Sequence, residues 1–193
     1  YALLSGSAHR LKAGRYALTQ GTSIPRIVQR LVAGPEEVEI LVREGETVRD
    51  IDEQLAALHL IDSGAVAQMK IADFAEQFPF AAHAYSLEGF LFPDTYRFLP
   101  GSTPREIVEK FLTNFEAKAL PLFQQSSEKN RYRDLIIASL IEREVPDKIS
   151  RGLVAGVLRE RLRIGMPLQV DATVLYAACG FRFATCDPLT KND

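Results

Sequence analysis

The stretch GETVRDIDEQL, residues 45–55, decides the expected fold of the first part of the chain. Thr47 is a natural N-cap, because its hydroxyl can accept a hydrogen bond from an amide of the first helical turn. Apolar residues then follow at helical spacing. Residues 21–31, GTSIPRIVQRL, repeat the pattern with Ser23 in the capping position. The two stretches predict two capped helices.

Each expected helix follows a short stretch that is typical of a β-strand. These stretches are residues 14–18 (GRYAL) and 38–42 (VEILV), and Gly34-Pro35 separates the two units. The order predicts a small β-α-β-α domain, which we place at residues 1–82. A generic small α/β domain would show the same order, since capped helices after strands are common.

The helix starts resemble those of the LysM family of glycan-binding modules, which follow a G-[DE]-[ST]-[LIV] turn. Residues 45–48 (GETV) match this turn well, and residues 21–24 (GTSI) match it loosely. The resemblance implies a LysM-like fold for the first domain and leaves open whether that domain binds sugar.

Composition limits the classes of function. The chain has 193 residues, enough for two small domains, and 47% of them are hydrophobic. A net charge of -2 gives no reason to expect nucleic acid as a partner. The three histidines lack the spacing of metal ligands, so we expect no metal and no cofactor. Cys179 and Cys186 could form a disulfide or remain free thiols.

The start of the chain bears on its location. No apolar run approaches the roughly 18 residues that a membrane span needs. The chain opens on Tyr1 rather than Met. We therefore expect it to be part of a longer protein, in which an anchor could precede it.

The middle of the chain leads into an aromatic loop. Residues 62–82 are rich in Ala and Phe and predict one or two short helices. Residues 87–96, LEGFLFPDTY, contain Gly and Pro, which disfavour a long helix. Such a loop could fill the core with its Phe side chains, or it could form a cleft wall that presents Glu88 and Asp94.

The helix expected over residues 133–145 contains the strongest candidate for chemistry. Glu144 falls about 20° from Ile137 on the helical wheel, in the apolar stripe, whereas Glu142 falls at its edge. Desolvation raises the pKa of a carboxyl group, and a carboxyl that stays protonated near neutral pH can act as a general acid. A buried salt bridge of Glu144 with Arg161 or Arg163 is the structural alternative.

The last part of the chain offers polar candidates. Gly165 and Pro167 predict a turn after the helix over residues 152–162. Asp171 and Thr173 could cap the next short helix, expected over residues 174–178. Three side chains there could equally contact a sugar: Gln169, Asp171 and Tyr176.

Three segments together strongly resemble the YceG-like family of endolytic murein transglycosylases. They are LEGFLFPDTY (87–96), ASLIERE (138–144) and RLRIGMPLQVDATVLY (161–176), in the family's order and spacing. The resemblance implies an α+β protein, with the LysM-like domain followed by a mixed, mainly helical catalytic domain at residues 83–193. The family's sequence continues beyond residue 193, which implies that this catalytic domain is truncated at its C-terminus.

The resemblance also implies a function. Members cut the MurNAc–GlcNAc β-1,4 bond within nascent peptidoglycan strands and leave 1,6-anhydro-MurNAc ends. They are anchored in the bacterial inner membrane by a single span, face the periplasm or cell wall, and act beside wall-synthesis proteins. The catalytic acid/base is the second Glu of E-x-E, here Glu144. Two positions depart from the family's pattern, Val145 and Ala172, and neither removes a reactive group.

The resemblance places the remaining candidates around Glu144. The residues expected to hold the glycan are Gln169, Asp171, Tyr176, Glu88, Tyr96, Asp94 and Thr173, with Glu142 and Arg161 as supports behind them. Two rival interpretations stay open. A non-catalytic peptidoglycan-binding or scaffold module would use Glu144 only as an ion-pair partner. A two-carboxylate muramidase would need Glu88 or Asp94 to face Glu144 across a cleft.

Overall fold

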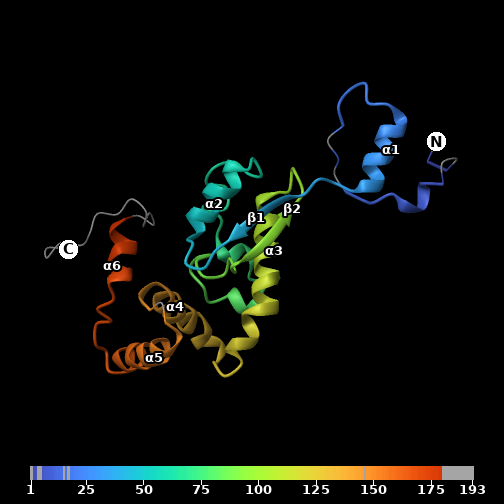
Figure 1. Cartoon of the computed structure of the whole chain (residues 1–193). Helices are drawn as coiled ribbons and strands as arrows, with labels where there is room; N and C mark the ends of the chain where they lie inside the picture. Colours follow the sequence, from blue (N-terminus) through green and yellow to red (C-terminus); the bar gives the residue numbers. More distant parts are fainter. Residues whose placement is uncertain (1, 4–5, 15, 17, 146, 180–193) are drawn as a thin grey trace.

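The computed structural model describes residues 2–3, 6–14, 16, 18–145 and 147–179. It is mainly helical with one two-stranded sheet, so the expected α+β class is confirmed. Figure 1 shows α1 apart from the rest, a middle body around β1, β2, α2 and α3, and a group formed by α4, α5 and α6. No helix among the described residues has the length and apolarity to cross a membrane.

The elements have the following bounds. The helices are α1 (Ile24–Ala33), α2 (Val48–Ala57), α3 (Pro104–Lys118), α4 (Glu128–Glu144), α5 (Lys148–Arg163) and α6 (Asp171–Ala178). The strands are β1 (Val38–Val42) and β2 (Asp94–Phe98). Short 3-10 helices cover Ala8–Arg10, Ile71–Phe74, Pro79–Ala81 and Leu120–Phe123, and the second and third of these are the short helices expected in residues 62–82.

The two strands pair antiparallel, with Val38 opposite Phe98 and Val42 opposite Asp94. Alternate residues of each strand face the core, as the pleat requires. The expected strand over residues 14–18 is wrong for its described residues, Gly14, Tyr16 and Leu18, which lie outside any strand. The Tyr16 hydroxyl instead donates to the carbonyls of Lys12 and Leu31, so this stretch folds back on α1.

The larger hydrophobic core lies between the sheet, α2, the 3-10 helices and α3. Its fully buried side chains include Ile51, Leu55, Phe74, Ile107 and Phe111. The core and the sheet both cross the expected boundary between residues 82 and 83. Residues on both sides of this boundary therefore pack in one core. The assignment of separate functions to residues 1–82 and 83–193 stays a prediction.

A second, smaller core joins α4, α5 and α6. It contains Ile137 and Ile141 of α4 and Val145 just after that helix. The segments that follow add Leu158, Val170 and Ala172. Cys179, just after α6, lies in a disulfide, and Cys186, the other cysteine of the sequence, is outside the described residues.

The predicted helix starts differ in how they are capped. Thr47 caps α2 as expected: its hydroxyl accepts from the amide of Asp50, whose carboxylate accepts from the Thr47 amide in return. Ser23 occupies the N-cap position of α1 but makes no capping hydrogen bond through its side chain. Of the two helix starts, the one whose turn matches the LysM pattern well, residues 45–48, is thus the one with a full capping box.

A buried carboxylate holds the segment after α2. Asp52 is 2% exposed, and its oxygens accept from the amides of Gly64 at 2.6 Å, Val66 at 2.7 Å and Ala67 at 3.1 Å. Three main-chain donors on one carboxylate offset the cost of burying it. This anchor fixes the turn that leads to the 3-10 helices beneath the core.

Replacing Asp52 with Ala should lower the free energy of unfolding by roughly 3 kcal/mol, because three buried amides lose their acceptor. Urea unfolding followed by circular dichroism measures this. Asp62→Ala removes an exposed acid nearby and should stay within about 0.5 kcal/mol of the parent. Equal effects of the two changes would show that the amide contacts do not anchor the segment.

Candidate active site

Glu144 lies at the C-terminal end of α4 and meets the start of α6. Its Oε1 accepts a hydrogen bond of 2.9 Å from the amide of Ala172, in the first turn of α6. The N-cap residue of α6, Val170, has no side-chain acceptor to offer. The carboxylate of Glu144 therefore acts as the cap from another helix, where the positive end of the helix dipole favours it.

The expected burial of Glu144 is wrong, since its side chain is exposed. The buried stripe of α4 runs through Ile137, Ile141 and Val145, four residues apart. At about 100° per residue, the centre of that stripe lies about 60° from Glu144. Packing against α5 and α6 thus follows the i, i+4 row and leaves Glu144 at the rim.

The expected salt bridges to Glu144 are also not formed. Arg161 donates to the main-chain carbonyl of Leu168 and so braces the turn before α6. Arg163 pairs with Glu160 on its own helix. Neither arginine neutralises Glu144, and the structural alternative of a buried ion pair fails.

Glu142 supports the junction of α4 with α5. Both its oxygens accept from the Arg151 guanidinium at 3.0 Å, and Arg151 Nε donates to the carbonyl of Val145. This forked geometry fixes the end of α4 against the start of α5. Glu142 therefore stabilises the helix that ends in Glu144.

The polar candidates at the start of α6 are close in sequence to Ala172, whose amide donates to Glu144. Gln169 and Asp171 are exposed on either side of Val170, and Gln169 has a positive φ of 53°. The expected capping roles of Asp171 and Thr173 are wrong. Helix α6 already begins at Asp171, and the Thr173 hydroxyl donates to the Val170 carbonyl at 2.6 Å rather than accepting.

Glu88 and Tyr176 form a second contact of α6, farther along the helix. The Glu88 carboxylate accepts from the Val48 amide with both oxygens at 3.2 Å, and the Tyr176 hydroxyl hydrogen-bonds to the same carboxylate. Burial raises the pKa of Glu88, against the lowering effect of the Val48 amide and Tyr176. Burial also raises the pKa of Tyr176, and the adjacent Glu88 adds to this.

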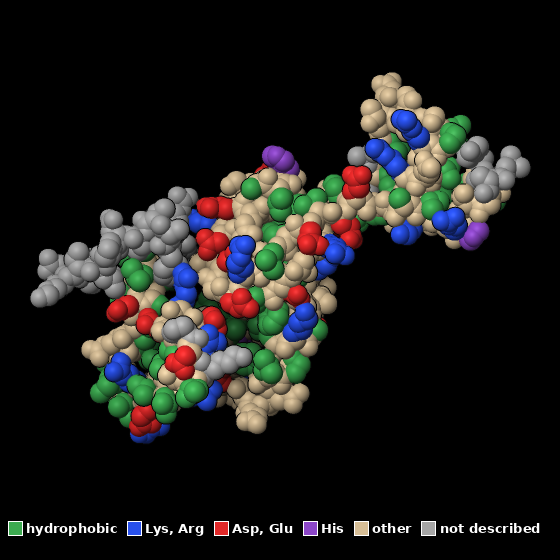
Figure 2. Space-filling view, in the orientation of Figure 1, with side chains coloured by type: hydrophobic (Ala, Val, Ile, Leu, Met, Phe, Trp, Pro, Cys, Tyr) green, Lys and Arg blue, Asp and Glu red, His purple; other side chains and the backbone are tan. Residues whose placement is uncertain are grey.

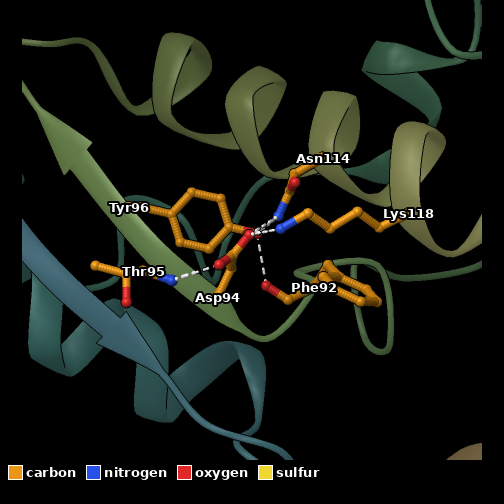
Figure 3. A network of polar contacts seen from close by, with 6 residues as sticks. All are labelled: Phe92, Asp94, Thr95, Tyr96, Asn114 and Lys118. Carbon is orange, nitrogen blue, oxygen red and sulfur yellow. Dashed lines mark hydrogen bonds and ion pairs between the residues drawn. The ribbon is translucent and has the colours of Figure 1, made fainter.

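Asp94 and Tyr96 are placed elsewhere, in the network drawn in Figure 3. Asp94 accepts from Asn114 at 2.8 Å and from Lys118, and the Lys118 contact contributes most to lowering the pKa of Asp94. The buried Tyr96 hydroxyl donates to the Phe92 carbonyl, and burial raises the pKa of Tyr96 to about 12. Their partners are Phe92, just before β2, and Asn114 and Lys118 on α3, so this network joins the sheet to α3.

Sequence reasoning missed two tyrosines, one near Tyr176 and the other in contact with the first. Tyr132 on α4 is close enough to Tyr176 to raise its pKa, and its ring stacks on that of Phe90. Tyr85 is 91% exposed, and its ring meets the edge of Tyr132 at 5.9 Å between centroids. The partly buried Tyr132 and the exposed Tyr85 thus form an aromatic pair beside the Glu88–Tyr176 contact. Only their nearness in the fold reveals them.

A family model described as the YceG-like family matches residues 1–191. The chain belongs to this family. An endolytic murein transglycosylase of Bacillus subtilis is 32% identical over 189 residues, which cover 89% of this chain and 52% of that protein. Another, of Streptococcus pneumoniae strain D39, is 29% identical over 195 residues and covers 86% and 35% of the two chains. The chain thus spans about half or less of these relatives.

A solved structure supports the fold of this YceG-like chain. A yceG-like protein of Listeria monocytogenes superposes with a TM-score of 0.65 over 98% of this chain and 67% of its own. The identity is 24%, so this likeness concerns the fold alone. It includes α4 to α6, whose arrangement brings Glu144 to the start of α6.

Replacing Glu88 with Gln should change how stability depends on pH. The folded-state pKa of Glu88 is raised from its ordinary 4.5, so the folded chain gains stability as the pH falls through the folded pKa and loses it as the pH rises again. As the pH is lowered from neutral to 4.5, the free energy of unfolding of the parent should therefore rise relative to that of Glu88→Gln. Paired denaturant curves at several pH values measure the difference, and a flat difference would contradict the raised pKa.

A matched variant isolates the contact with α6. Tyr176→Phe keeps Glu88 and its Val48 donor but removes the hydroxyl, and should cost about 1 kcal/mol at neutral pH. Relative to the parent, the variant should show a larger increase in amide hydrogen exchange in α6 than in α2. Unchanged exchange in α6 would mean that the Tyr176 hydroxyl does not hold this helix.

Proposed function

We propose that this chain belongs to an endolytic peptidoglycan lytic transglycosylase, a lyase that cuts the MurNAc–GlcNAc bond and leaves 1,6-anhydro-MurNAc ends. One observation carries the proposal: Glu144, the second Glu of the E-x-E motif, is exposed and held by the Ala172 amide. The names of the Bacillus subtilis and Streptococcus pneumoniae relatives support the same reaction.

The mechanism needs one carboxyl group. Glu144 protonates the glycosidic oxygen that leaves C1 of MurNAc, and its carboxylate then takes the proton of the C6 hydroxyl of the same sugar. The C6 oxygen bonds to C1 as the glycosidic bond breaks, so water is not consumed. The Ala172 amide fixes Oε1, and Oε2 has no hydrogen-bond partner among the described residues. Oε2 is therefore the oxygen that we assign to proton transfer.

The glycan contacts follow from exposure. Gln169 and Asp171 are exposed close in sequence to Ala172, the partner of Glu144, and Thr173 lies in the same helical turn. The exposed ring of Tyr85 offers a face on which a sugar can stack, with Tyr132 behind it. Tyr176 and Glu88 are bonded to each other, which suits a supporting role.

The two-carboxylate muramidase is disfavoured by the engagement of the other acids. Glu88 is bound to the Val48 amide and Tyr176, and Asp94 is paired with Lys118 on α3. A second acid that faces Glu144 with a water or a sugar carbon between them is what that mechanism requires. Neither candidate is presented in that way.

Three finer features belong to the same proposal. The LysM-like character of residues 1–82 is supported by the capping box of Thr47 and Asp50 at the GETV turn. An anchor in the inner membrane, with the site facing the periplasm or wall, is supported by the family resemblance alone. So is an association with wall-synthesis proteins.

Glu144→Gln should abolish cleavage of peptidoglycan strands and leave the fold intact. The Gln carbonyl can still accept from the Ala172 amide, but an amide transfers no proton. Mass analysis of digests should show anhydro-ended fragments with the parent and none with the variant. Glu142→Gln serves as the matched control and should retain cleavage, with a loss confined to the stability of the α4–α5 junction.

The other outcomes separate the rival functions. Reducing ends in place of anhydro ends would replace the lyase by a hydrolase. Bound but uncut glycan with both proteins would favour the non-catalytic binding module.

A further inference from the structure

The charges of this chain are divided unevenly along its length. Residues 1–35, here called the basic lobe, contain five basic residues and no Asp or Glu. The remaining residues carry a net charge of -7, so the overall -2 conceals a lobe of +5. Figure 2 shows Lys and Arg among hydrophobic side chains over this lobe, with acidic ones first at its junction with the body.

The basic lobe has no hydrophobic core of its own among its described residues. None of their side chains is buried, and α1 contributes to neither core of the molecule. Large aliphatic side chains are instead open to solvent: Leu3 is 85% exposed, Ile24 63%, Leu18 47% and Leu11 40%. These side chains leave apolar area on one small lobe that an apolar surrounding would remove from water.

Polar groups of α1 and the loop before it line an open hollow on this lobe. Arg26 and Arg30, four residues apart on one face of α1, lie at it with Gln29 and the loop over residues 19–23. No acidic side chain lines the hollow. It therefore suits an anionic group such as a phosphate.

From these observations we propose that the basic lobe docks on an anionic lipid bilayer, with lipid phosphates at Arg26 and Arg30 and the exposed aliphatic side chains in the interface. This surface is separate from the site at Glu144. A basic helix with aliphatic flanks is the kind of element that lies on a membrane surface without spanning it. Each Lys or Arg near such a surface adds to the attraction.

A lipid surface fits the lobe better than a sugar chain or an acidic protein does. Sugars stack on aromatic rings, and the described part of the lobe has one aromatic residue, Tyr16, whose hydroxyl is bonded to main-chain carbonyls. An acidic protein would use the arginines but not the scattered aliphatic side chains. A bilayer uses both, since its phosphates and acyl chains lie within one interface.

Flotation of the 193-residue chain with vesicles tests the proposal. We expect binding to vesicles that contain phosphatidylglycerol, weak binding to phosphatidylcholine alone, and a loss as salt rises from about 0.1 M to about 0.5 M. Arg26→Gln/Arg30→Gln should weaken the partition coefficient about tenfold or more. Arg43→Gln/Arg97→Gln makes the same change in charge on the body and should bind like the parent.

Further arms separate the sources of binding. Ile24→Ser should also weaken binding to the anionic vesicles, with the salt dependence kept. Glycerol phosphate at matched phosphate concentration should not displace the chain, and displacement would reduce the surface to a simple anion site. Equal loss in both double arginine variants, or binding to purified glycan strands and not to vesicles, would overturn the proposal.

The result is independent of the catalytic proposal. Glu144→Gln should float with the vesicles as the parent does, and the Arg26→Gln/Arg30→Gln chain should keep its cleavage of soluble glycan strands. If one proposal fails, the other can therefore still be tested.

Discussion

Main-chain amides without a partner in their own segment constrain this fold at three places, and each is satisfied by a distant carboxylate. Asp52 accepts from the amides of Gly64, Val66 and Ala67. Glu88 accepts from Val48, and Glu144 accepts from Ala172. Two of these amides belong to helix starts, where they lack a partner within the helix. Each of these three carboxylates therefore fixes one segment of the chain against another.

The contact at Ala172 gives Glu144 two functions that restrict one another. As a cap it holds the start of α6, because its oxygen accepts from an amide that has no partner within the helix. As the proposed acid/base it must also exchange a proton with a sugar. Holding one oxygen by a main-chain donor while the other faces the substrate satisfies both, because the reacting group is oriented without being buried. Catalysis would then depend on how well α6 is held, and Tyr176 contributes to that from the far end of the helix.

Local chemistry made much of the fold predictable, whereas contacts between distant segments did not. The helices after Ser23 and Thr47 follow from the spacing of their apolar residues, and the burial of Phe90 follows from the apolar run over residues 87–92. The strand over residues 14–18 was wrong because β1 finds its partner in β2, which lies more than fifty residues later. No local pattern announces that pairing.

The candidate site shows the same limit. The motif selected Glu144, but the helical wheel placed it in the buried stripe, because the wheel cannot know which row of α4 the neighbouring helices will cover. Asp94 and Glu88 look alike in the sequence, two carboxylates in one aromatic loop. The fold sends Asp94 to Lys118 and Glu88 to α6. Tyr85 could be identified as a candidate only from its ring contact with Tyr132.

Helix α6 contacts residues of both cores, and this has a mechanical consequence. Helix α6 packs in the second core through Ala172, yet Tyr176 reaches Glu88, which belongs to the loop of the first core. Under the proposed function, a glycan that extends from Gln169 past α6 to the exposed ring of Tyr85 would therefore touch residues attached to both cores. Its binding energy would be available to hold the two cores in one arrangement, and Glu144 is correctly oriented only when the end of α4 and the start of α6 keep that arrangement. A chain with two small cores can in this way couple substrate length to the placement of a single acid.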